Sequence, residues 1–236
     1  MRAPPTQAAR IVGLALAAQL ASGLIALGAV ELAGEALGPR EGVLMGLAAV
    51  LQGLLLVLVG VTHGAEFRTG RLGGLALLVI AAGLVADAVL QLAEWLGLSP
   101  EGLDGLAEAV RSDGVVGASL FVGLVILAPL GEELVFRGAL WRALSSLGTR
   151  SALVGTSIAF AVVHLDPLHV VATLPLAFFL GWLRHVTGSL AVCVVAHALN
   201  NAVWWLSVHA GFQGPAAWIA APVGALVLAA AVWRWR

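Results

Sequence analysis

Apolar stretches follow one another along this chain and are separated by short polar connections. Most approach the ~20 residues that a helix needs to cross the hydrocarbon core of a bilayer. We identify eight such stretches: residues 11–33, 42–62, 73–97, 115–146, 151–165, 168–184, 188–208 and 215–233. Only Asp166 and Pro167 separate the short fifth and sixth stretches, so this pair is either two crossings or a re-entrant hairpin. The pattern predicts an all-α fold, a polytopic bundle of about eight transmembrane helices.

Composition supports a membrane protein and excludes several other classes. The chain is 61% hydrophobic and 11% charged, with a mean hydropathy of +1.02, which no soluble domain of this length shows. Because Cys193 is its single cysteine, it has no internal disulfide and no cysteine-based metal cluster. It lacks the lysine that a P-loop requires, and its arginines form no basic domain for nucleic acid. We therefore expect a lipid bilayer and no nucleic acid as its partner.

The basic residues, all arginines, predict an orientation, because short cytoplasmic loops and tails collect positive charge. With both termini cytoplasmic, nine arginines fall inside, Arg40 and Arg111 fall outside, and Arg137 is embedded. The acidic loop from Leu98 to Gly114 then lies outside, and Ser99-Pro100-Glu101 predicts the start of a short helix within it. We expect a multi-pass protein of the cell membrane, and the absence of lysine favours a prokaryotic source.

Polar groups that lie deep in apolar stretches are concentrated in one part of the chain. Residues 1–112 hold three spans with scattered charges and the acidic loop, and residues 209–236 hold the last span and a tail. Residues 115–208 contain almost every deep polar group. We interpret this middle part as the catalytic core, with its active-site cavity inside the membrane.

Two adjacent glutamates and an arginine interrupt the fourth apolar stretch, and ionised groups at such depth usually mark function. Glu133 and Arg137 are four residues apart, so they share a helix face and are expected to form an ion pair. Glu132 points roughly 140° away from Arg137. It is therefore free to face a cavity, where a carboxylate can act as a general base. A Glu-Arg pair that only ties helices together is the alternative.

Three further polar residues lie in the later stretches: His164 in the fifth, and His197 and Asn201 in the seventh. At about 1.5 Å of rise per residue, Glu132, His164 and His197 lie roughly 21, 20 and 14 Å from the cytoplasmic ends of their helices, so they can converge. His164 could share a water with Glu132. His197 and Asn201, four residues apart, would offer two donors to an oxyanion. The alternatives are an interfacial His164 and interhelical hydrogen bonds from His197 and Asn201.

The same residues carry a resemblance to a known family. Residues 128–138 resemble the E-E-x-x-x-R motif of the CAAX prenyl endopeptidase and bacteriocin-processing family (CPBP, or Abi), a group of intramembrane glutamate proteases. Residues 160–164 are similar to its F-x-x-x-H motif, and residues 197–201 to its H-x-x-x-N motif. The resemblance covers about residues 115–208, and the first three spans carry no motif.

What the resemblance implies is a hydrolase that cuts a peptide or a lipidated protein at the membrane. Its catalytic residues would be Glu132 and His164, which activate water, and His197 and Asn201, which stabilise the oxyanion. The residues that shape the site would be Glu133, Arg137 and Phe160.

Two histidines and two glutamates are also a possible zinc ligand set. The His-Glu-x-x-His signature is absent, so we favour a glutamate mechanism with no metal and no cofactor. The rival hypothesis is a non-catalytic membrane protein, an immunity or scaffold factor or a small transporter, that uses the same buried groups for binding. The sequence selects neither the substrate nor the oligomeric state.

Overall fold

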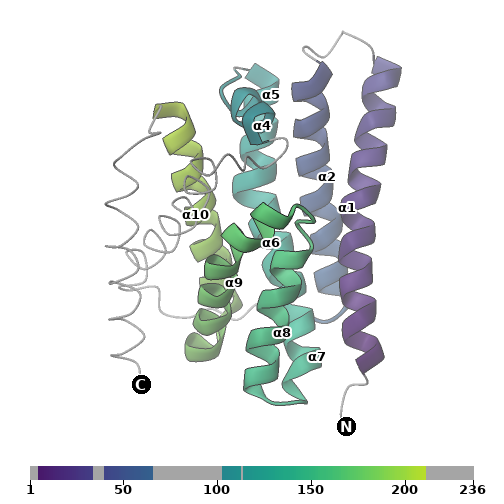
Figure 1. The fold of residues 1–236 in the computed structure, drawn as a ribbon. Helices are drawn as coiled ribbons and strands as arrows, with labels where there is room; N and C mark the ends of the chain where they lie inside the picture. The colour runs from purple at the N-terminus through teal and green to yellow at the C-terminus, as the bar shows by residue number, and fades with distance from the viewer. Residues whose placement is uncertain (1–4, 34–39, 66–102, 113, 211–236) are drawn as a thin grey trace.

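A computed structural model describes residues 5–33, 40–65, 103–112 and 114–210, and in these ranges the chain forms seven helices and no strand. The long helices stand side by side as a bundle (Figure 1). One of them, residues 114–145, changes between α and π geometry along its length and carries five labels. The elements are α1 (Pro5–Ala33), α2 (Arg40–Thr62), α4 (Leu103–Val110), α5 (Gly114–Leu120), η2 (Phe121–Leu127), α6 (Ala128–Glu133), η3 (Leu134–Leu140), α7 (Trp141–Ser145), α8 (Thr149–Val162), α9 (Pro167–Thr187) and α10 (Leu190–Ala210).

Five helices are long and apolar enough to cross a membrane, which confirms the all-α, multi-pass class. These candidate spans are Thr6–Leu32, Gly42–Thr62, Gly114–Ser145, Pro167–Thr187 and Leu190–His209. The expected spans at 73–97 and 215–233 lie outside the described residues, so the total of eight helices stays a prediction. The division at 1–112, 115–208 and 209–236 likewise stays an interpretation.

The helix expected in the acidic loop is present as α4, although the proposed start at residues 99–101 lies outside the described residues. Its last residue, Val110, is completely buried. It packs in an apolar cluster with Val30, Val116 and Val208, which come from α1, α5 and α10. The loop helix therefore covers one end of the bundle.

The connection between α8 and α9 lies about midway along α1 and α2 (Figure 1). With 14 residues, α8 is about 21 Å long, too short for a hydrocarbon core of ~30 Å. Leu165 makes the turn with a φ of +64°, and the Asp166 side chain caps α9 by accepting a hydrogen bond from the backbone N–H of His169. The turn places His164 near the middle of the bundle (Figure 1), and the choice between a re-entrant hairpin and two crossings stays a prediction, since α9 is itself long enough to cross.

Glycines allow α2 to lie directly against the long helix of residues 114–145. A Cβ atom on Gly131 would come within 2.7 Å of the Gly53 carbonyl oxygen, and one on Gly60 would come within 2.9 Å of the Leu134 carbonyl carbon. Only glycine permits so close an approach of two helix backbones. Glu132 and Glu133 follow Gly131 directly and are thereby fixed beside α2.

The ends of the bundle differ in charge as the sequence predicts. The start of α1, the α7–α8 connection and the α9–α10 connection lie at one end (Figure 1). The arginines of these segments are Arg10, Arg142, Arg150 and Arg184. Arg111 follows α4 at the opposite end. Which end faces the cytoplasm stays a prediction.

Candidate active site

A fully buried ion pair forms the base of the site. The Nη1 atom of Arg137 donates to Oε1 of Glu133 over 3.0 Å, and neither side chain has any exposure. The Nη2 atom of Arg137 donates to the backbone carbonyl of Ala177 over 2.8 Å. The expected pair is therefore present, and it also joins the long helix to α9.

Phe160 packs against three of the polar side chains. The guanidinium carbon of Arg137 lies 4.3 Å from the centre of its ring, a cation–π contact. The rings of His164 and His197 lie 5.4 Å and 5.5 Å from it, centre to centre. Phe160 is itself 1% exposed, so its position fixes the spacing between these groups.

His197 lies between the two glutamates. Its Nδ1 atom is 3.1 Å from Oε1 of Glu133, and its Nε2 atom is 3.8 Å from Oε2 of Glu132. Because a carboxylate accepts, Nδ1 is the donor toward Glu133. Glu133 thus contacts both His197 and Arg137, so these three side chains form one buried network.

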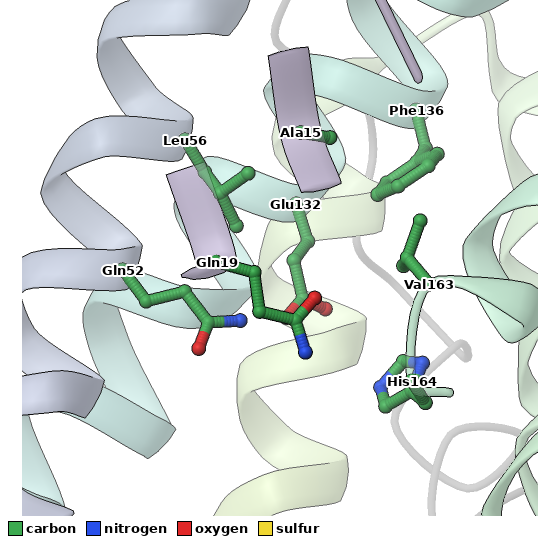
Figure 2. Close-up of a pocket in the computed structure, with 8 residues that line it drawn as sticks. All are labelled: Ala15, Gln19, Gln52, Leu56, Glu132, Phe136, Val163 and His164. Carbon is green, nitrogen blue, oxygen red and sulfur yellow. The ribbon is translucent and has the colours of Figure 1, made fainter. Parts of the chain in front are cut away.

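Glu132 points away from the ion pair into a cavity, as its helical phase predicts. The cavity has an empty volume of about 280 Å³, including the part open to the outside. The Glu132 side chain is 12% exposed and forms no hydrogen bond with any residue that the structure describes. Eight residues line the cavity: Ala15, Gln19, Gln52, Leu56, Glu132, Phe136, Val163 and His164 (Figure 2).

His164 enters the same cavity from the turn of the hairpin. Its Nδ1 atom lies 2.9 Å from the Phe160 carbonyl oxygen, which can only accept. Nδ1 therefore carries the hydrogen, and Nε2 of the neutral ring is left as an acceptor. The cavity has room for one water between Glu132 and His164, because a water needs only about 10–15 Å³ of accessible space.

Asn201 has a different partner from the one its spacing predicts. Its Nδ2 atom donates to the Leu124 carbonyl over 2.8 Å, and its Oδ1 atom accepts from Asn200 over 3.1 Å. His197 contacts the two glutamates, so the two side chains have different partners in this structure. Their role at an oxyanion stays a prediction.

The π-helical segments explain two of these contacts. The Ala128 N–H bonds to the carbonyl of Gly123, five residues back, instead of the carbonyl of Leu124, four residues back. The Leu124 carbonyl is thereby left for the side chain of Asn201. The Trp141 N–H bonds to Phe136 and Gly138 and passes over the carbonyl of Arg137. Arg184 donates its Nε–H to that oxygen over 3.0 Å. Such π turns are frequent at functional sites, and here each one releases a carbonyl that a side chain of α9 or α10 binds.

Sequence reasoning missed Gln19 and Gln52, the two amides of the cavity. They come from α1 and α2, which carry no family motif. Each is a lone amide in the middle of an apolar stretch, and polar groups at that depth are a functional signal.

The part of the chain that is described holds no group of three His, Cys, Asp or Glu side chains placed to bind a metal ion.

Fold and site together define a multi-pass membrane protein with a buried glutamate–histidine cluster. Residues 115–203 match the model of the type II CAAX prenyl endopeptidase Rce1-like family. This match agrees with the resemblance that the three motifs indicate. Comparisons with curated proteins and with solved structures gave no match. The matched residues include the whole ion-pair cluster and His164, but neither α1 nor α2.

Proposed function

We propose that this protein is a membrane-embedded endopeptidase that hydrolyses a peptide bond with a water activated by Glu132 and His164. The observation that carries the proposal is the shared cavity: the Glu132 carboxylate has no hydrogen-bond partner among the described residues, and it faces a space that His164 also lines. The similarity of residues 115–203 to the CAAX prenyl endopeptidase family supports a peptide as the substrate.

The proposed reaction begins with a water that donates one hydrogen bond to Glu132 and the other to Nε2 of His164. Glu132 takes a proton as the water oxygen attacks the scissile carbonyl carbon, and the carbonyl oxygen becomes an oxyanion. The tetrahedral intermediate collapses when the C–N bond breaks, and the proton held by Glu132 passes to the leaving nitrogen. The products are a carboxyl group and an amine, and Glu132 returns to its starting state.

The remaining cluster would hold Glu132 in place. His197 lies beside it, with Nε2 3.8 Å from the carboxylate, and is itself held by Glu133, which Arg137 binds in turn. From the family resemblance we also assign His197 and Asn201 to the oxyanion. The Asn201 amide has a second N–H beyond the one that binds Leu124, and this N–H is the donor that we assign.

We propose that the substrate is a peptide or a lipidated protein in the bilayer, and a prenylated C-terminal segment is the first choice because the matched family consists of CAAX prenyl endopeptidases. The test is cleavage of prenylated and unprenylated membrane-anchored peptides by the full chain in detergent or liposomes. Wild type should cut, and Glu132→Ala and Glu132→Gln should not. Glu108→Gln, an exposed glutamate on α4, is the matched control and should cut normally.

Two further outcomes decide between the hypotheses. Loss of cleavage with a metal chelator would replace the metal-free mechanism with a metal-dependent one. A Glu132→Gln protein that functions like wild type in cells would favour the non-catalytic scaffold or transporter, because such a protein needs the shape of the cavity and not its base.

A further inference from the structure

We propose that Gln19 and Gln52 bind the backbone of the substrate peptide, so that α1 and α2 form part of the substrate site. The inference rests on the proposed peptidase function and extends it to two helices outside the family match. It assigns to these amides a direct contact with the substrate.

Position is the first argument. Gln19 extends from α1 and Gln52 from α2 into the cavity that Glu132 and His164 line (Figure 2). The wall is firmly packed, because Ala15 and Leu56, on the same two helices, belong to one buried apolar cluster with Phe136. The two amides are therefore fixed components of the cavity that holds the proposed base.

The side chains of Gln19 and Gln52 also lack hydrogen-bond partners in the described part of the chain. Ser22, one turn along α1, donates to the backbone carbonyl of Gln19 and not to its amide. An amide that only joined α1 to α2 would bond to the other helix, and no such bond links Gln19 and Gln52. Polar groups at this depth that have no partner among the described residues are available to a ligand.

The chemistry of the substrate is the third argument. A peptide that enters the membrane carries N–H and C=O groups that must be satisfied there without bulk water. A primary amide supplies both donors and an acceptor, so it can pair with an extended backbone. The other polar groups of the site are engaged: Glu132 and His164 with the proposed water, and Asn201 with Leu124. Gln19 and Gln52 are the free amides of the cavity.

The experiment compares Gln19→Leu and Gln52→Leu with Gln7→Leu, a control on α1 that does not line the cavity. The probe is a farnesylated peptide with a fluorophore, used in liposomes with the full chain. Cleavage gives KM and kcat, and the Kd of the uncut peptide is measured with each variant placed in a Glu132→Gln background. We expect each cavity variant to raise KM and Kd roughly three- to tenfold, with the melting temperature and the Gln7→Leu protein unchanged.

A second probe separates backbone contact from a general effect of cavity shape. Replacing one peptide bond near the cleavage site by an ester removes an N–H and weakens the carbonyl acceptor. At a position that the amides bind, wild type should discriminate against the ester and the Gln→Leu variants should not. If neither variant changes KM, Kd or this discrimination at any position tested, the inference is wrong and the amides only join α1 to α2, which a lower melting temperature would show.

Failure of the inference can be told from failure of the proposed function. Cleavage by wild type with unchanged Kd in both variants overturns the inference and leaves the peptidase intact. Binding that weakens in both variants, with no cleavage by wild type, supports the inference and overturns the peptidase. If no peptide of the panel binds at all, the amides have no peptide to contact and the inference falls.

Discussion

The helices at the N-terminal side and the motif-bearing helices contribute different polar groups to the same cavity. The motif-bearing helices supply Glu132 and His164, and behind them Glu133, Arg137 and His197 form one buried network. The polar groups from α1 and α2 are two uncharged amides, Gln19 and Gln52, without partners among the described residues. The difference supports our proposals that the paired charges hold Glu132 in place and that the two amides bind the substrate.

The largest expected effect tests these proposals directly. Glu132→Gln keeps the size of the side chain and removes the base, so kcat should fall by about 10²–10⁴-fold. Gln52→Leu should change kcat/KM by roughly tenfold at most. Single-turnover cleavage of the farnesylated peptide measures both. Equal losses in the two variants would contradict the separation of catalytic and binding groups.

Among the variants considered, replacing Arg137 should lower the free energy of unfolding most. Arg137→Leu leaves Glu133 as a buried carboxylate without its cation, and breaking a buried pair in this way costs about 3–5 kcal/mol. The expected result is a large drop in melting temperature in detergent. The double variant Glu133→Leu with Arg137→Leu should recover much of it, because it removes both charges. Matched changes at Gln19 and Gln52 should leave the melting temperature unchanged, since no buried charge loses a partner there.

Much of this site could be predicted from spacing alone, and the reason is local geometry. Glu133 and Arg137 are one helical turn apart, so their ion pair follows from the periodicity of a single helix. The outward direction of Glu132 follows from the same rotation. The short fifth stretch and the break at Asp166 allowed either a re-entrant hairpin or two crossings, and the sequence alone did not choose between them.

The rest depends on contacts between helices, which a single sequence does not encode locally. Asn201 shares a helix face with His197, yet the carbonyl released at Leu124 by π geometry decides its partner. Gln19 and Gln52 are 33 positions apart and carry no motif, so only the packing of α1 and α2 against the long helix brings them to Glu132. The sequence shows only that each amide lies in the middle of an apolar stretch, and it does not show that the two amides share a cavity.

Asn201 offers a test of whether the motif region is as purely catalytic as its motifs imply. Asn201→Leu removes the donor to Leu124, and an unpaired buried carbonyl costs about 1–3 kcal/mol. If Asn201 only joins α10 to the long helix, its loss would lower the melting temperature and leave kcat nearly unchanged. An oxyanion donor would lower kcat by about 10²–10³-fold. We expect both effects, because the amide has one N–H for each task. Ser207→Ala on the same helix, where the hydroxyl donates to the Trp204 carbonyl, is the control for kcat.

The smallest predicted effect concerns the contact that joins the two regions. Gly131→Ala would place a Cβ atom 2.7 Å from both the Gly53 carbonyl oxygen and the Leu56 side chain. Either α2 must move or the long helix must bend, which lowers the free energy of unfolding by about 1–3 kcal/mol. Because Glu132 follows Gly131 and Gln52 precedes Gly53, the displacement should separate the base from the amide. We therefore expect kcat and KM both to worsen, unlike the change in kcat alone at Glu132. Gly155→Ala, where the added Cβ would meet only the movable Leu144 side chain, is the control, and equal kinetics in the two variants would show that α2 does not help to position the site.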